Sequence, residues 1–210
     1  MSAEGARAEL RSDGLPAVTP SDAQLLERTA RGDKSAFGEF VERHRGAVFR
    51  FARWCTADAA DAEDVLQQTF VSAWRAAGDV RAEHGARPWL LSIARRAAAK
   101  ARQRHDERRS RESSIEELGE AAGFGDERFT PERIAQATEQ RTCIEAALTR
   151  LAADEREILV LRDVEGLDGA ATAELLGISL AAQKSRLHRA RLRWAAELRT
   201  CLDQEAQHAR

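Results

Sequence analysis

Apolar residues recur at helical spacing along most of the chain, and this periodicity restricts the fold more than any other feature. Within residues 37–51 one helix face takes positions i, i+3, i+4, i+7, i+11 and i+14: Phe37, Phe40, Val41, His44, Val48 and Phe51. No segment of the sequence shows the two-residue alternation of a convincing strand. The sequence therefore predicts an all-α fold, with His44 as an interior imidazole rather than a ligand.

The charges divide the chain into blocks. The 210 residues carry a formal charge of −2, but residues 22–111 carry +5, residues 112–140 carry −6 and residues 141–210 are neutral. A basic block, an acidic stretch and a balanced block indicate two small helical domains joined by a flexible acidic linker. The predicted segments are a disordered N-terminal tail at 1–21, a first domain at 22–105, a linker at 106–139, a second domain at 140–200 and a C-terminal tail at 201–210.

The cysteines and the apolar stretches exclude several classes of protein. Cys55, Cys143 and Cys201 stand far apart without a C-x-x-C motif, which argues against a disulfide framework and favours three ordinary, partly buried thiols in a reducing compartment. The N-terminus has no apolar core of a signal peptide. The longest tempting apolar stretch, Pro88–Ala94, is far shorter than the ~20 residues that span a bilayer. We expect a cytoplasmic protein without membrane insertion.

Helix-start signals recur at several points. Ser21 with Gln24 three residues later forms a capping box, and Asp154 with Glu157 suggests another. Pro88 suits the first turn of a helix. From Arg81 to Arg111 the chain carries ten Lys or Arg residues against three acids, so we expect this helix to present positive charge to a polyanion.

The most specific local pattern lies near the C-terminus. Asp168 can cap a short helix that ends at Leu176, Gly177 can turn the chain, and Ser179 can cap a long helix. Two helices joined by a short glycine-containing turn are typical of a helix-turn-helix DNA-binding motif.

The long helix divides into two faces. At about 100° per residue, Leu180, Leu187, Ala190 and Trp194 share one arc. The opposite arc is polar and basic: Lys184, Ser185, His188, Arg189 and Arg191. One face can pack on partner helices while the other enters the major groove, where Lys and Arg donate to guanine edges. The alternative interpretation is a solvated basic face on a core helix.

Three segments resemble the extracytoplasmic-function (ECF) sigma factors of bacterial RNA polymerase. Ala62–Phe70 (AEDVLQQTF), with Trp74, looks like region 2 of that family, and Trp89–Arg95 (WLLSIAR) is similar to the start of its promoter-melting helix. Lys184–Arg191 (KSRLHRAR) resembles region 4. The resemblance covers about residues 22–105 and 140–200 in the family's order.

The resemblance implies a role for each matching position. Asp64, Gln67 and Gln68 would contact the clamp helices of the largest subunit of core RNA polymerase. The minus-10 promoter element would be held by basic side chains of the melting helix, namely Arg95, Arg96, Lys100, Arg102 and Arg104. The minus-35 element would meet the helix-turn-helix through Lys184, Ser185, Arg186, His188, Arg189 and Arg191, of which the arginines at 186 and 191 would grip phosphates.

The chain departs from the family pattern in the melting helix and in region 4. Arg96 and Lys100 stand where the family usually has Asn and Asp, which favours general phosphate attraction. Gln183 falls on the arc expected to be buried, where an amide needs hydrogen-bond partners.

Two other classes of protein compete with this interpretation. A stand-alone helix-turn-helix regulator would explain the C-terminal half and leave the Ala62–Phe70 helix without a role. A DNA-processing enzyme would need metal-binding carboxylates converging from separate elements, whereas Asp61, Glu63 and Asp64 form one local cluster. We therefore expect a sigma factor, not an enzyme, with no metal or cofactor. Its partners would be core RNA polymerase, promoter DNA and, as is common in the family, an anti-sigma factor that the sequence does not identify.

Overall fold

The computed structural model describes residues 19–80, 85–111 and 141–208, and these residues form helices and short connections without a strand. The prediction of an all-α fold is confirmed. Most of the proposed linker lies outside the described residues. The helix before it continues to Arg111, six residues past our proposed boundary, and the last helix continues to His208 through most of the proposed tail.

The first domain contains four helices: α1 (Asp22–Ala30), α2 (Lys34–Cys55), α3 (Ala59–Ala76) and α4 (Ala86–Arg111), with a 3-10 turn, η1 (Ala77–Asp79), after α3. The capping box at α1 is confirmed, because Ser21 Oγ accepts from the Gln24 amide at 3.3 Å and Gln24 Oε1 accepts from the Ser21 amide at 2.8 Å. Asp33 and Asp58 are the N-caps of α2 and α3, and their carboxylates accept from backbone amides of the first turn.

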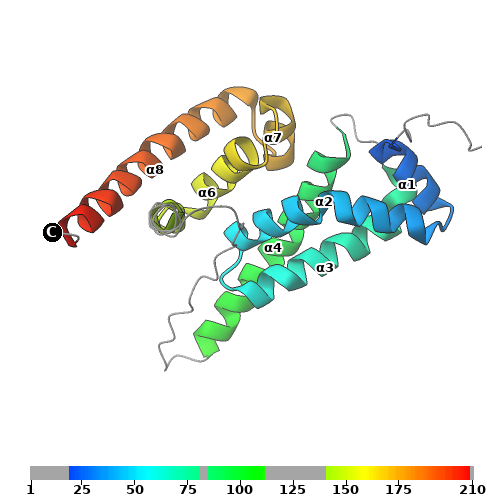
Figure 1. The fold of residues 1–210 in the computed structure, drawn as a ribbon, viewed down its shortest axis with the longest axis horizontal. Coiled ribbons are helices and arrows are strands. Elements are labelled where there is room, and N and C mark those ends of the chain that lie inside the picture. Colours follow the sequence, from blue (N-terminus) through cyan, green and yellow to red (C-terminus); the bar gives the residue numbers. More distant parts are fainter. Residues whose placement is uncertain (1–18, 81–84, 112–140, 209–210) are drawn as a thin grey trace, which may run out of the picture.

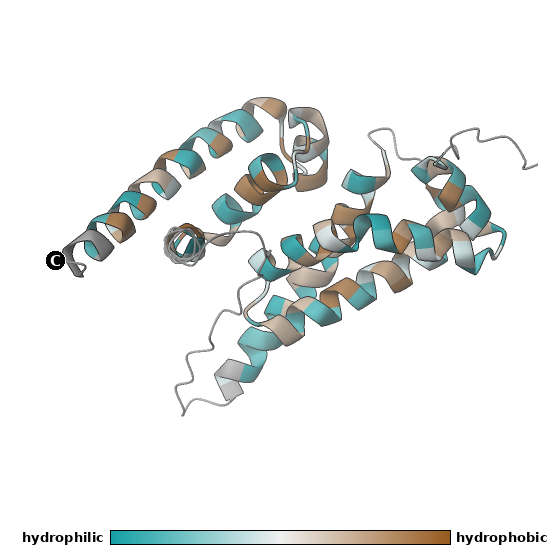
Figure 2. Ribbon diagram, in the orientation of Figure 1, coloured by the Kyte–Doolittle hydropathy of each residue, from teal (hydrophilic) through white to brown (hydrophobic). Residues whose placement is uncertain are grey.

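The core of the first domain lies where α2, α3 and α4 face one another (Figures 1 and 2). Phe40, Val48 and Phe51 are fully buried along α2, as the helical periodicity predicted. Phe37 packs edge-on against Trp74 of α3, with ring centroids 5.0 Å apart. These large side chains fix the angle between α2 and α3 and so hold the opposite face of α3 toward solvent.

His44 is a structural residue, as predicted. Its ring is buried on α2, and Nε2 lies 2.9 Å from Oδ2 of Asp22 in α1. Burial lowers the pKa of His44, and the nearby Asp22 carboxylate opposes that shift without overcoming it. The neutral imidazole therefore joins α1 to α2.

The second domain begins with a helix over residues 141–149. It continues through α6 (Ala153–Leu159), the single π-helical turn η2 (Val160–Val164), α7 (Gly169–Leu176) and α8 (Leu180–His208). Asp168 accepts from the Ala171 amide at 2.8 Å, and Ser179 accepts from the Ala182 amide at 3.1 Å, which confirms both predicted caps. Gly177 has φ +67°, a left-handed conformation that suits glycine, and it turns the chain between α7 and α8.

The predicted capping box at Asp154 is wrong. Ala152 is the N-cap of α6, and no side chain caps it. The Ala152 carbonyl already accepts from the amides of Glu155 and Arg156, so the helix starts two residues earlier than the side-chain pattern indicated. Asp154 instead lies in the first turn, where a carboxylate favours the helix N-terminus.

The cysteines also differ from the prediction. Cys143 and Cys201 form a disulfide with Cα atoms 5.6 Å apart, joining the 141–149 helix to the last part of α8. Their separation of 58 residues hides this proximity in the sequence. Cys55 is a buried free thiol, and burial raises its pKa to about 12, so it stays protonated.

The two domains touch each other. Helix α2 contacts α6 and η2, α4 contacts α7, and one cluster of buried apolar side chains continues across both domains. The C-terminal end of α8 lies far from the first domain (Figure 1). None of the described helices combines the length and apolar character needed to cross a membrane.

Candidate nucleic-acid and protein interfaces

The outer face of α3 carries the three side chains assigned to polymerase binding. Asp64, Gln67 and Gln68 are all exposed, while Phe70 is buried on the opposite side of the same helix. Val71 continues this face and is also exposed. The structure therefore gathers the three residues into one solvent-exposed polar strip on α3, with the apolar Val71 at its end.

Asp61, at the start of α3, has a different role from its neighbour Asp64. Its carboxylate is buried, with Arg108 Nη2 3.4 Å from Oδ1 and His105 Nδ1 3.8 Å from Oδ2. Both partners belong to α4, so Asp61 ties the two helices together. Asp58, Asp61 and His105 are the group within the described residues whose atoms lie close enough to suggest a metal site, within 4.8 Å of one another. Asp58 caps α3 and Asp61 is paired, so both carboxylates already serve the fold.

The five basic residues assigned to minus-10 binding occupy two faces of α4. Arg95 and Arg102 are half-buried, seven residues apart on one face. Arg96, Lys100 and Arg104 are exposed, at four-residue spacing on another face. The structure thus brings three of the five together in solvent, and it separates the other two from them.

Arg95 is engaged by the second domain. Its Nε lies 3.0 Å from Oε1 of Glu157, whose side chain is 7% exposed. Nothing in the sequence connects these positions, which are 62 residues apart.

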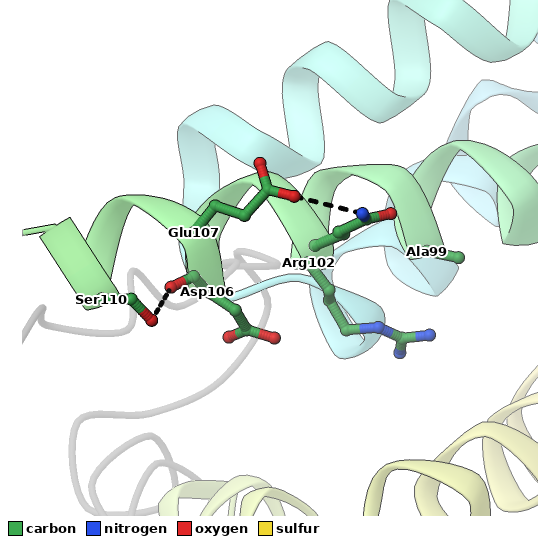
Figure 3. Close-up of a pocket in the computed structure, with 6 residues that line it drawn as sticks. Ala99, Arg102, Asp106, Glu107 and Ser110 are labelled. Atoms are coloured by element: carbon green, nitrogen blue, oxygen red, sulfur yellow. Dashed lines mark hydrogen bonds between the residues drawn. The ribbon is translucent and has the colours of Figure 1, made fainter.

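A shallow hollow follows the distal half of α4 (Figure 3). Its lining comes from this helix alone: Ala99, Arg102, Gln103, Asp106, Glu107 and Ser110. Gln103 donates to Glu107 at 3.1 Å, and Ser110 donates to the Asp106 carbonyl at 2.9 Å. These groups satisfy one another along one helix surface rather than converging on a reacting atom.

The outward face of α8 matches the predicted recognition surface in part. Lys184, Ser185, His188 and Arg189 are exposed, and Arg189 Nη1 donates to Ser185 Oγ at 2.9 Å. A side chain held in this way is partly oriented before any contact with DNA.

The two residues assigned to phosphates have acidic partners instead. Arg191 forms two hydrogen bonds with Asp163, at 2.9 and 2.6 Å, which raise its pKa, and Arg186 lies 3.8 Å from Asp154. DNA phosphates would compete with these carboxylates for the two guanidinium groups.

The buried stripe of α8 differs from the prediction at its first turn. Leu180, expected inside, is 45% exposed, and Gln183 is 2% exposed with no hydrogen-bond partner for Nε2. Leu187 and Ala190 are buried and Trp194 is half-buried, as predicted. Gln183 lies four residues before Leu187 and so continues the inward face, whereas Leu180 begins the helix at the surface.

Three functional candidates were missed by the sequence interpretation, namely Arg50, Glu157 and Glu165, and the pairing of Arg87 with the second domain was not predicted. Arg50 and Arg87 of the first domain both pair with Glu165 of the second domain, and Arg95 pairs with Glu157. The sequence separations are 115, 78 and 62 residues. A local sequence pattern cannot predict ion pairs between residues so far apart. These pairs become visible only when the positions of the two domains are known.

Comparison with protein families decides between the classes that the sequence left open. Residues 40–108 match the family model for Sigma-70 region 2, and residues 141–193 match that for Sigma-70 region 4. The sigma factor NccH of Alcaligenes xylosoxydans xylosoxydans is 34% identical over 85% of this chain and 95% of its own length. The ECF sigma factor SigM of Mycobacterium tuberculosis is 33% identical over 83% of both chains.

This chain belongs to the ECF sigma factors. It is an alternative sigma factor for promoter-directed transcription initiation, and its relatives are transcription factors rather than enzymes. Among solved structures, CnrH in complex with the cytosolic domain of CnrY is similar with a TM-score of 0.62 and 27% identity, over 86% of this chain and 99% of that one. The sigma factor RpoE of Bartonella quintana shares the fold, with a TM-score of 0.64 at 23% identity.

Proposed function

We propose that this sigma factor binds core RNA polymerase through the exposed face of α3. Asp64, Gln67 and Gln68 would contact the clamp helices of the largest subunit. The proposal is supported by their alignment in one solvent-exposed strip on a helix whose other side is locked into the core by Phe70. A rigid helix that presents a prearranged polar face loses little conformational entropy on binding.

We propose further that the two domains contact two promoter elements. The exposed residues Arg96, Lys100 and Arg104 of α4 would follow the backbone of the opened minus-10 strand. Lys184, Ser185, His188 and Arg189 of α8 would read the minus-35 element in the major groove. The observation that carries the second assignment is the helix-turn-helix itself, with a Gly177 turn, a capped α8 and its basic face in solvent.

The remaining proposed contacts need a rearrangement of ion pairs. Arg95 and Arg102 would join the minus-10 surface once Arg95 leaves Glu157, and Arg186 and Arg191 would exchange their aspartates for phosphates. The exchanges at Arg186 and Arg191 cost little because their pairs are solvent-exposed. Releasing Arg95 requires the second domain to move away, so that the buried Glu157 carboxylate reaches water.

A protein partner that restrains the sigma factor is also proposed. CnrH, 27% identical to this chain, was solved in complex with the cytosolic domain of CnrY. An anti-sigma factor of this chain would act in the same compartment as the polymerase, the cytoplasm.

In vitro transcription with purified core polymerase tests the polymerase contact. On a pool of genomic fragments, the wild-type protein should produce defined start sites that are absent with core enzyme alone. Asp64→Arg should abolish them by weakening polymerase binding, whereas Glu42→Arg, the same charge change at an exposed residue of α2, should not. If no fragment responds and the wild-type protein fails to bind core polymerase, the proposal is wrong and a stand-alone regulator becomes the better explanation.

The minus-35 assignment is tested in the same assay. Arg189→Ala should lose transcription from responsive promoters while retaining polymerase binding, because a base contact is worth about 1–3 kcal/mol of discrimination. Arg199→Ala removes an exposed arginine ten residues further along α8 and serves as the matched control. Normal transcription by Arg189→Ala would remove this residue from the recognition surface.

A further inference from the structure

Glu165 is a carboxylate buried between the two domains. Its side chain is 0% exposed, and Arg50 of α2 holds it through two hydrogen bonds, from Nε to Oε1 at 3.0 Å and from Nη2 to Oε2 at 3.2 Å. Arg87 at the start of α4 donates to the same Oε2. A buried carboxylate is tolerated only when it is paired and hydrogen-bonded, so region 4's Glu165 depends on two arginines of region 2.

Glu157 repeats this arrangement nearby. It pairs with Arg95 of α4 and is almost fully buried. Glu157 lies in α6 and Glu165 directly after η2, eight residues further on, and their α4 partners Arg95 and Arg87 are also eight residues apart. Arg87 and Arg95 lie on one α-helix, about 12 Å apart along its axis. The two acids therefore meet the two bases in antiparallel order. The interface is therefore an organised charge pattern rather than a single chance contact.

The three arginines keep part of their surface in solvent even when paired. The side chains of Arg50, Arg87 and Arg95 are 50, 41 and 38% exposed. A guanidinium group binds carboxylate and phosphate with the same forked geometry. If the second domain moves away, the first domain is left with three guanidinium groups on one surface, without these carboxylates.

We propose that Arg50, Arg87 and Arg95 form a phosphate-binding surface of region 2 and that Glu157 and Glu165 of region 4 cover it in the free protein. Nucleic acid and region 4 then compete for the same three side chains. Arg50 and Arg87 become DNA contacts in addition to the minus-10 residues of α4. This inference rests on the proposed function, because the phosphates are those of promoter DNA.

The competition predicts that the isolated sigma factor binds DNA poorly and that neutral glutamates release the surface. When only a fraction of molecules is competent to bind, the apparent dissociation constant equals the intrinsic one divided by that fraction. Replacing both glutamates by glutamine removes the charge and keeps the side-chain size. The apparent affinity for DNA should increase even though no residue of the DNA-binding surface has changed.

The test measures binding of a fluorescein-labelled 20-nucleotide single strand to the full chain without polymerase. Glu157→Gln with Glu165→Gln should bind at least about 10-fold more tightly than the wild type. The slope of log K against log salt should steepen by about 2, since three phosphates contribute about 0.7 each. Adding Arg50→Ala and Arg87→Ala to this variant should remove most of the gain.

The control carries the same change in net charge. Glu145 and Glu197 are half-buried glutamates of the second domain that pair with Arg141 and Arg150 of that domain. Glu145→Gln with Glu197→Gln should leave DNA affinity close to that of the wild type. Circular dichroism establishes that each variant keeps its helices. If the Glu157→Gln, Glu165→Gln protein does not fold, Glu157→Gln alone should still increase the affinity, by releasing Arg95.

Three results would overturn the inference: unchanged affinity in the folded glutamate variant, an equal gain in the control variant, or a gain that survives the loss of Arg50 and Arg87. Failure of the proposed function has a different signature. It appears as absence of polymerase-dependent transcription by the wild-type protein, whereas the binding assay contains no polymerase. A wild type that directs transcription, together with unchanged affinity in the glutamate variant, would refute the competition alone.

Discussion

Removing the disulfide should destabilise the second domain strongly. Cys143 lies on the 141–149 helix and is fully buried, and Cys201 is half-buried near the end of α8. The bond closes a loop that contains α6, α7 and the part of α8 that precedes Cys201. Reduction, or the variant Cys201→Ser, releases that loop in the unfolded chain while leaving the packing of Cys143 nearly intact.

The expected magnitude follows from the length of the loop. Cross-linking residues 58 apart removes unfolded-state entropy worth about 4 kcal/mol at 25 °C on the chain-entropy model. A small domain with an m-value of about 1–3 kcal/mol/M in urea should therefore lose at least about 1 M in its unfolding midpoint. That loss is comparable to the whole stability of many domains of this size.

Urea unfolding followed by circular dichroism, with and without dithiothreitol, measures the effect. The wild-type midpoint for the second domain should fall on reduction, and the oxidised Cys201→Ser protein should already unfold at the lower value and ignore the reductant. Cys55→Ser should keep the full response, because Cys55 is a buried free thiol outside the loop. A reductant effect below about 0.5 kcal/mol in the wild type, or one that persists in Cys201→Ser, would refute the reasoning.

Three further predictions concern the fold. The pKa of His44 is lower in the native state than in the unfolded chain, where it is about 6.5. The unfolded chain therefore binds the proton more readily, and the free energy of unfolding decreases as pH falls through that value. Urea titrations from pH 7.5 to 5 should show this decrease in the wild type, and His44→Gln should lack it. Gln183→Leu should raise the free energy of unfolding by about 1 kcal/mol, because it removes a buried amide nitrogen without a partner, and a decrease would contradict this. Gly177→Ala should lower the free energy of unfolding by about 1–2 kcal/mol at φ +67°. Gly38→Ala, inside α2 with no atom within 4 Å of an added Cβ, should raise it by up to ~1 kcal/mol in the same assay.

Helix starts were predicted correctly where a side chain near the start of the helix caps it. Ser21, Asp168 and Ser179 cap helices as their side chains indicate, because each bond reaches an amide three residues away. Asp154 failed as a cap because a backbone turn at Ala152 began the helix first. The sequence pattern at Asp154 is therefore compatible with two helix starts, one with Asp154 as the N-cap and one with Ala152 as the N-cap. The backbone hydrogen bonds at Ala152 show that the second forms.

Long-range pairing could not be predicted from the sequence. The residues in contact at Cys143–Cys201 and at Arg50–Glu165 are 58 and 115 positions apart, and neither pair belongs to a motif. Gln183 is an intermediate case: helical periodicity correctly placed it on the buried arc of α8. Its missing amide partner depends on the neighbouring helices, which no periodicity describes.

The distribution of acids explains how a nearly neutral chain can offer selective basic surfaces. In the second domain, Asp163 and Glu155 neutralise Arg191 and Arg193 at 2.6 Å, on the flank of α8 that faces the domain. The exposed strip with Lys184 and Arg189 has no ion pair among the described residues. Binding to DNA would change the ion pairing of these two groups differently. Arg191 and Arg193 would exchange a carboxylate for a phosphate, whereas Lys184 and Arg189 would gain an anionic partner without giving up a carboxylate. If α8 meets DNA as proposed, the strip should contribute more to the salt dependence of binding than Arg191 and Arg193, because only the strip brings the phosphates positive charge that no carboxylate already compensates.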